Sequence, residues 1–337
     1  MDIYEQVVLA SRPTGAPKPE NFRLESGPMP VAAVGELLVR TRYLSLDPYM
    51  RGRMNVAKSY AKPVEIGQPM EGEVVAEVIQ SRHPDYRVGE LVQARTGWRT
   101  HAAVGVAGLR RVDPARAPIT TALGVLGMPG FTAYAGMKVI GQPKPGETVV
   151  VAAASGPVGS LVGQMARLAG ARAVGIAGGP EKCAYLRDEL GFDAAIDHRS
   201  ESLADRLAEA CPSGIDVYFE NVGGPIWQAV LPLLNRFARV PMCGVIAHYN
   251  GAGGAERDLL PATMVAIVRK SLLLRGYINY EFVDEYYEAF LREIGPKVKV
   301  GEIRYREDIA DGLESAPEAF MGMLAGRNFG KALVRVG

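Results

Sequence analysis

The chain has 337 residues, of which 48% are hydrophobic and 22% are charged, and its formal net charge at pH 7 is +1. This length suggests about two domains, each able to bury a core. Balanced charge provides no field for recruiting nucleic acid, and no apolar run approaches the roughly 20 residues that span a bilayer. We therefore expect no nucleic-acid partner and no membrane association.

The N-terminal residues and the cysteines indicate a cytoplasmic setting. The start, MDIYEQVVLASRP, carries acids and lacks the basic segment and apolar core of a secretory signal. Cys183, Cys211 and Cys243 are widely spaced, and their odd number argues against a disulfide framework. The four histidines show no HxxH or HExxH spacing. We therefore expect a reducing location and no metal site.

Residues 1–125 are predicted to form a β-rich domain of barrel or sandwich type. The segments GELLVRTRYLSLD, EGEVVAEVIQ and GELVQARTGWRTHAAV are short, partly alternating strands separated by Gly and Pro. Residues 124–141 then predict a loop that leads into a helix. The tail, residues 300–337, ends in a β-like run, which we expect to return to the first domain and close it.

Residues 126–299 are predicted to form an α/β domain with a doubly wound, parallel (Rossmann) sheet, because strands and helices alternate. Strands are expected at 148–153, 172–176, 194–197, 215–220, 238–245 and 273–278, and helices near 158–169, 181–190, 202–211, 225–234 and 260–270.

The segment TVVVAAASGPVG, residues 148–159, predicts a dinucleotide-binding turn. An apolar run is followed by a small-residue turn and an amphipathic segment, as at the start of a βαβ unit. The turn is AxxGxxG rather than GxGxxG, with Ala154 at the first glycine position. A helix N-terminus here offers bare N–H groups and a positive dipole end to a pyrophosphate. The predicted contacts are Gly156, Pro157, Val158 and Gly159.

The next strand favours NADP(H) over NAD(H). Domains that prefer NAD usually end this strand with an acid that binds the ribose 2′-hydroxyl, but here RAVGI, 172–176, runs into AGGPEK. An acid would repel a 2′-phosphate, whereas Lys182 brings a positive charge within reach. The alternative is that Lys182 is a solvated surface lysine.

Seven motifs carry a family resemblance: YLSLDPYMRGRM (43–54), GMPGFTAYAG (127–136), AASGPVG (153–159), AGGPEKCAYL (177–186), DVYFENVGG (216–224), MCGVIAHYN (242–250) and GRNFGKALV (326–334). By these motifs the chain resembles the zinc-independent medium-chain dehydrogenases/reductases. Within them it is similar to the branch of prostaglandin (leukotriene) reductases, plant double-bond reductases and bacterial NADPH-dependent curcumin reductases.

The resemblance implies a GroES-like β-rich domain beside the Rossmann domain. It implies a reductase that transfers hydride from NADPH to the β-carbon of an α,β-unsaturated ketone or aldehyde, such as curcumin-like enones and alkenals. It also implies a homodimer in which cofactor domains pair through their sheets. Zinc-dependent relatives place Cys and His ligands in the first domain, whereas this chain has no Cys before residue 183 and no His in GQPMEGEV, 67–74. Carbonyl activation is therefore expected from hydrogen-bond donors.

Tyr249 is the first candidate for such a donor. Hydride addition to an enone places negative charge on the carbonyl oxygen, and a preorganised donor there lowers the barrier. Tyr249 follows the carboxyl end of strand 238–245, where ligands bind in open α/β sheets. The resemblance places it beside the nicotinamide ribose and the substrate. The alternative is a tyrosine that packs at the strand end.

Tyr49 is the second candidate. Pro48 stiffens the loop before it, and the resemblance implies that this segment borders the substrate pocket. Tyr49 either lines the pocket or donates to the carbonyl; the alternative is that it covers the core of the β-rich domain. Arg51 and Arg53 are expected to be surface or interdomain charges.

The resemblance assigns Lys182 to the 2′-phosphate. Where relatives commonly add a tyrosine, this chain has Asp197, His198 and Arg199. A histidine can also donate to phosphate, and its charge rises as pH falls. His198 either contacts the phosphate or faces solvent, and Arg199 could reach the same phosphate.

Other cofactor contacts follow from the resemblance. Asn221 is expected to act through its side chain or backbone, and Cys243 is expected to be a small buried residue whose backbone passes the cofactor. The alternative for Asn328 is a simple turn. This set comprises Asn221, Cys243, Gly244, Ile246, Tyr249, Tyr277, Asn279 and Asn328.

Two other functions are compatible with the sequence. One is a quinone reductase of the same fold, and the other is a redox sensor that holds NADPH without turnover. The proton for the α-carbon would come from water or a phenol. The size of the substrate pocket depends on loops such as 250–262, so the sequence does not identify the physiological substrate.

Overall fold

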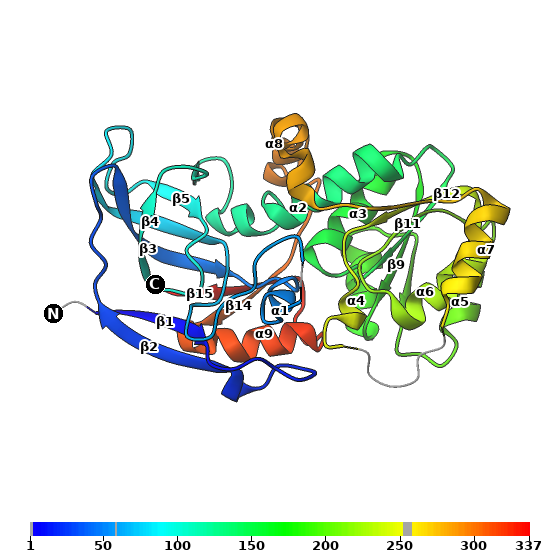
Figure 1. The fold of residues 1–337 in the computed structure, drawn as a ribbon. Coiled ribbons are helices and arrows are strands. Elements are labelled where there is room, and N and C mark those ends of the chain that lie inside the picture. Colours follow the sequence, from blue (N-terminus) through cyan, green and yellow to red (C-terminus); the bar gives the residue numbers. More distant parts are fainter. Residues whose placement is uncertain (1–2, 58, 252–257) are drawn as a thin grey trace. The chain divides into compact units, whose positions relative to one another are not determined.

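The computed structural model describes residues 3–57, 59–251 and 258–337, so residues 252–257 of the loop at 250–262 lie outside it. The chain forms two compact units, Met1–Gly124 with Glu307–Gly337, and Val125–Arg306 (Figure 1). The sequence analysis placed the return to the first domain at residue 300, whereas the structure keeps residues 300–306 with the second unit. There Ile303 is buried, and the Arg304 N–H donates to Gln164 Oε1 at 2.8 Å.

The first unit is built on a mostly antiparallel sheet with the strand order β14-β15-β3-β4-β5-β7, in which β6 also pairs with β3. A separate antiparallel hairpin joins β1 to β2. The strands are β1 (Ile3–Leu9), β2 (Phe22–Pro28), β3 (Glu36–Ser45), β4 (Val74–Ser81), β5 (Leu91–Ala94), β6 (His101–Gly105), β7 (Arg110–Arg111), β14 (Glu307–Asp311) and β15 (Lys331–Arg335).

Three aromatic rings form part of the core of this unit. Trp98 is fully buried, with Phe22 stacked on it at a centroid distance of 5.8 Å. Phe320, from α9 (Ala316–Leu324), meets Trp98 edge-on at 5.6 Å. Such pairs add to the free energy gained by area burial alone. They fix the C-terminal helix against the N-terminal hairpin.

A buried ion pair ties the C-terminal strand β15 to the end of β3. The Lys331 and Asp47 side chains are 2% and 5% exposed, and Lys331 Nζ lies 2.8 Å from Asp47 Oδ1. Nζ also donates to the Leu46 carbonyl at 2.7 Å, and the Ser45 hydroxyl donates to the Asp47 carboxylate. The pair therefore fixes the loop that leads to Tyr49 and to α1 (Met50–Arg53).

The second unit has a six-stranded parallel sheet with the order β10-β9-β8-β11-β12-β13. This order reverses direction between β8 and β11, which makes the switch point of a doubly wound fold. Its strands and helices are α2 (Met128–Ala135), β8 (Thr148–Ala152), α3 (Pro157–Leu168), β9 (Arg172–Ala177), α4 (Pro180–Ala184), β10 (Ala194–Asp197), α5 (Leu203–Ala210), β11 (Ile215–Phe219), α6 (Gly224–Val230), β12 (Leu234–Met242), α7 (Leu260–Lys270), β13 (Leu273–Gly276) and α8 (Val283–Lys299).

Helices cover both faces of this sheet, with α2 and α3 on one side and α5 and α6 on the other (Figure 1). Val150 and Ala152 of β8 share a core cluster with Leu207 of α5 and Ile226 of α6. Burial on both faces explains why β8 is an unbroken apolar run rather than an alternating one. None of the helices in the described ranges combines the length and apolarity needed to span a membrane.

The boundaries of β12 differ from the prediction. The strand begins at Leu234, four residues before the predicted start at 238, because α6 is followed by a short turn that contains Pro232 and Leu234 then pairs with Ile215. Residues 243–245 are loop rather than strand. The Cys243 and Gly244 N–H groups donate to the Glu220 carbonyl instead of continuing the ladder.

We expect Lys331→Met to lower the free energy of unfolding by roughly 3–5 kcal/mol, because it leaves the Asp47 carboxylate buried without its cation. Urea denaturation measures the change. Arg335→Met on the same strand is the matched control, since its pair with Asp311 is largely exposed and should contribute about 1 kcal/mol or less. Equal losses in the two variants would contradict the role given to the buried pair.

Candidate functional site

Most of the predicted site residues follow the carboxyl ends of the six parallel strands. Because parallel strands end at the same edge of a sheet, the loops after them form one continuous rim. In strand order the residues are His198 after β10, Lys182 after β9, Gly156, Pro157, Val158 and Gly159 after β8, Asn221 after β11, Cys243, Gly244, Ile246 and Tyr249 after β12, and Tyr277 and Asn279 after β13. Tyr49 and Asn328 belong to the first unit.

The turn from β8 into α3 is closely packed. Ala153 has φ of +51°, and Gly156 is the N-cap of α3 without a side-chain cap. A Cβ on Gly159 would lie 2.6 Å from the Ala153 carbonyl oxygen, so only glycine fits there. The first N–H groups of a helix have no intrahelical acceptor. Val158 and Gly159 thus lie where backbone donors are available to an anion.

A basic group gathers at the ends of β9 and β10. A Cβ on Gly178 would lie 2.9 Å from His198 Nε2 and 3.1 Å from Arg199 Nε, so both side chains reach over this turn. Partial burial and the positive charge of Arg199 lower the pKa of His198, and Lys182 contributes in the same direction. Lys182, His198 and Arg199 therefore share one electrostatic environment.

The Asp197 carboxylate accepts hydrogen bonds from backbone N–H groups in the loops after β9 and β10. Its Oδ1 accepts the Gly179 N–H at 2.9 Å and the Arg199 N–H at 3.0 Å. Partial burial raises the pKa of Asp197, but these backbone hydrogen bonds outweigh it and leave the pKa lowered. The carboxylate is thus committed to backbone donors of the loop.

Asn221 links three strands at the switch point. Its Nδ2 donates to the Ala152 carbonyl at 2.7 Å, and its Oδ1 accepts the Cys243 S–H at 2.8 Å. Burial and the nearby Glu220 raise the pKa of Cys243 to about 12, so the thiol stays protonated. The Asn221 side chain thus holds together the ends of β8, β11 and β12.

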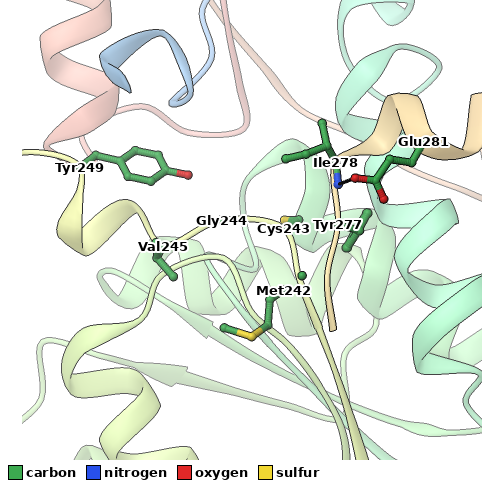
Figure 2. A pocket seen from close by; sticks show the side chains of 9 residues that line it. Met242, Cys243, Gly244, Val245, Tyr249, Tyr277, Ile278 and Glu281 are labelled. Carbon is green, nitrogen blue, oxygen red and sulfur yellow. Dashed lines mark hydrogen bonds between the residues drawn. The ribbon is translucent and has the colours of Figure 1, made fainter. Parts of the chain in front are cut away.

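An open pocket of about 410 Å³ lies at the ends of β12 and β13. Figure 2 shows Tyr249 on one side of it and Ile278 with Glu281 on the other. The Tyr249 hydroxyl would lie 3.0 Å from a Cβ on Gly244, so the phenol stands over that backbone. Cys243, Gly244, Tyr249 and Tyr277 of the predicted set line the pocket, whereas Ile246 and Asn279 do not.

The polar atoms of Tyr277 and Asn279 face α2. The Tyr277 hydroxyl donates to the Thr132 carbonyl at 2.7 Å, and Asn279 Nδ2 donates to Thr132 Oγ1 at 3.1 Å. Burial raises the pKa of Tyr277 well above its ordinary value. The end of β13 is thereby fixed to the motif GMPGFTAYAG, which forms α2.

Tyr49 precedes α1 and packs against the core of the first unit. The Arg53 guanidinium lies 5.6 Å from its ring centroid. Burial, followed by the charges of Asp47 and Glu73, raises the pKa of Tyr49 well above its ordinary value. The phenol is therefore neutral and able to donate a hydrogen bond.

Asn328 forms a local turn. Its Nδ2 donates to the Gly330 carbonyl at 2.8 Å, which is the alternative considered for this residue. The hydrogen bond holds the chain in position for the start of β15.

Arg51 and Arg53 are not surface charges, because both are buried. Arg51 donates to the Gly15 carbonyl at 2.7 Å, and Arg53 pairs with Glu71 at 3.2 Å. Gly15 and Glu71 are remote in sequence from these arginines, so the motif YLSLDPYMRGRM alone could not predict the contacts.

The sequence analysis missed Glu220 and Glu281. Glu281 lines the pocket and accepts the Ile278 N–H at 3.3 Å (Figure 2). Glu220 is buried directly after β11. The position of Glu220 at the end of the largely apolar segment DVYFE, 216–220, could have predicted a buried carboxylate.

The described residues contain no group of three or more His, Cys, Asp or Glu side chains placed to hold a metal ion. Zinc sites in proteins use three or four such ligands. The donor set of this part of the chain therefore does not fit zinc.

Two protein families match the chain. One, described as "N-terminal domain of oxidoreductase", matches residues 5–112, and the other, described as "Zinc-binding dehydrogenase", matches residues 157–294. These ranges fall within the first and second units respectively.

Named relatives match almost the whole chain. The NADPH-dependent curcumin reductase of Escherichia coli is 50% identical, over 98% of this chain and 96% of that protein. The 2-alkenal reductase (NADP(+)-dependent) of Nicotiana tabacum is 38% identical, over 98% and 97%. The crystal structure of CurA in complex with NADPH from Vibrio vulnificus is 48% identical, covers 99% of both chains and gives a TM-score of 0.95.

Proposed function

The chain belongs to the medium-chain dehydrogenase/reductase family, and from this premise we propose that it uses NADPH to reduce the C=C bond of α,β-unsaturated ketones and aldehydes. The observation that carries the proposal is the arrangement along one sheet edge: a basic group at β9 and β10, a glycine turn after β8, and a pocket with Tyr249 at β12 and β13. Relatives named as curcumin and alkenal reductases support it.

The proposed cofactor contacts follow the chemistry of NADPH. Lys182 and Arg199 bring positive charge to the 2′-phosphate, and two cations suit a phosphate dianion. His198, whose pKa is lowered, can donate to the phosphate through its neutral ring. The backbone donors of Val158 and Gly159 suit the pyrophosphate. Because the basic group takes the adenosine end, the nicotinamide end lies toward β11–β13, on the other side of the switch point.

When bound, NADPH supplies the hydride for the substrate β-carbon. The Tyr249 phenol donates to the carbonyl oxygen while negative charge develops there, and a preorganised donor of this kind contributes roughly 3 kcal/mol. Tyr49, whose neutral phenol can also donate, is a second candidate. This proposal needs no zinc.

We also propose a homodimer that forms at the β13 edge of the sheet. β13 ends the strand order and so offers unpaired backbone groups. Beside it, α7 exposes Leu260, Met264, Val265 and Val268, the last of them 78% exposed. An apolar patch next to an open edge suits a second copy of the same chain.

The test of function is NADPH consumption with three classes of acceptor. We expect the wild-type protein to oxidise NADPH with benzylideneacetone and cinnamaldehyde, giving products reduced at C=C, and more slowly with benzoquinone. Faster turnover of benzoquinone would favour the quinone reductase. Tight NADPH binding with background oxidation across the panel would favour the redox sensor.

In the same assay, Tyr249→Phe should lower turnover of the enone by about a hundredfold, because it removes one donor from the developing oxyanion. The affinity for NADPH should change little. Tyr280→Phe, at an exposed neighbouring tyrosine that does not line the pocket, is the control. Unchanged turnover of several enones by the Tyr249 variant would remove that residue from the mechanism.

Lys182→Ala should raise the KM for NADPH by about tenfold or more, since a hydrogen bond to a charged group is lost, and should leave the KM for NADH nearly unchanged. Steady-state kinetics with both cofactors measures the difference. Lys299→Ala, at the exposed end of α8, is the control. Equal effects on the two cofactors would refute the phosphate contact.

Val268→Glu should convert the dimer into a monomer, because it places a charge in the apolar patch on α7. Sedimentation velocity of the wild type and the variant measures the change. A wild-type protein that sediments as a monomer at every concentration would rule out the proposed dimer.

A further inference from the structure

Glu220 is a buried carboxyl group that the proposed reaction does not use. The residue is 1% exposed and follows β11 at the switch point of the sheet. Its Oε1 accepts three neutral donors, the Tyr218 hydroxyl at 3.0 Å, the Val222 N–H at 2.6 Å and the Gly223 N–H at 2.9 Å. Burial raises the pKa of this carboxyl despite these hydrogen bonds.

Burial of the Glu220 carboxyl at the end of β11 costs free energy, and its hydrogen bonds indicate a structural role. Burying a polar group costs free energy that hydrogen bonds only offset, and the preceding strand, Ile215–Phe219, is otherwise largely apolar. The partners of Glu220 show what it organises, because two of its three donors are backbone groups of the loop immediately after it. The carboxyl therefore sets the course of residues 221–224.

The turn of residues 221–224 supports the wall of the pocket. The Asn221 and Val222 carbonyls accept the Ile246 N–H at 3.2 Å and the Ala247 N–H at 3.0 Å. A Cβ on Gly223 would lie 2.9 Å from His248 Nε2, so the histidine ring packs directly over the turn. Segment 243–249, which ends in Tyr249 (Figure 2), thus rests on residues 221–224.

We propose that Glu220 is a positioning residue for the nicotinamide end of the NADPH site: its carboxyl shapes the turn of residues 221–224, and that turn sets the place of segment 243–249. The inference rests on the proposed function, because it takes NADPH as the cofactor. It assigns Glu220 no contact with cofactor or substrate.

The variants separate acceptor geometry from charge. Glu220→Gln keeps an oxygen acceptor on a side chain of the same length. Glu220→Ala leaves the Val222 and Gly223 N–H groups without their acceptor. Glu220→Asp keeps the acid but shortens its reach, and it replaces the alanine variant if that variant does not fold. Glu209→Gln, at an exposed carboxylate on α5, is the matched control.

Three readouts test each purified variant: the NADPH dissociation constant by fluorescence titration, kcat and KM with benzylideneacetone, and thermal unfolding. We expect Glu220→Ala or Glu220→Asp to raise the NADPH dissociation constant and KM by about tenfold and to lower kcat at saturating NADPH. Glu220→Gln should stay within about threefold of wild type, and the control should match wild type.

Two results would overturn the inference. A folded alanine or aspartate variant with lower thermal stability but wild-type dissociation constant and KM would make the role purely structural. A glutamine variant as impaired as alanine would show that charge, not acceptor geometry, matters. If the wild type binds NADPH but reduces no enone, the proposed function fails while the dissociation constants still decide the role of Glu220.

Discussion

The two hydrogen bonds of the Asn221 side chain, to Ala152 and from Cys243, join the carboxyl ends of β8, β11 and β12. The candidate site depends on this junction, because the glycine turn, the turn after Glu220 and the Tyr249 segment all begin at these strand ends. Beyond the last residues of the parallel sheet, the loops are joined by side chains and by backbone hydrogen bonds of their own, such as that from the Ile246 N–H to the Asn221 carbonyl. The arrangement of these loops therefore depends on neutral hydrogen bonds at the strand ends, whereas the positive charge lies at the ends of β9 and β10.

The two ends of the proposed cofactor site differ in electrostatic character. Lys182 and Arg199 make one end basic, although partial burial and these two charges lower the pKa of His198 between them. The pocket end contains groups that stay neutral, among them Cys243 and Tyr277 with raised pKa values. This division suits a molecule whose charge is concentrated at its phosphates. It also bears on reactivity, because α,β-unsaturated carbonyl compounds are electrophiles and only a thiolate is a strong nucleophile. A Cys243 held as a thiol can line a pocket for such compounds without adding to them.

The sequence predicted the parallel sheet and its edge because the deciding signals are local: the apolar run of β8, the small residues after it, and the missing acid at the end of β9. Other features depended on partners remote in the chain. The buried Arg51 guanidinium donates to the Gly15 carbonyl, and the Tyr277 hydroxyl donates to the Thr132 carbonyl. The start of β12 was missed because Leu234 pairs with Ile215, which no local pattern encodes. The burial of Glu220 likewise follows from packing around the strand end.

The buried pair between Lys331 and Asp47 has a consequence for biosynthesis. The first unit takes its last strand from the C-terminus, since β15 pairs with β3 and carries Lys331. The second unit is continuous, from Val125 to Arg306. Domains fold as units while the chain is made from its N-terminus. The nucleotide-binding half can therefore form on the ribosome, whereas the other half must hold Asp47 and residues 43–45 of β3 without these partners until residues 331–335 have been made.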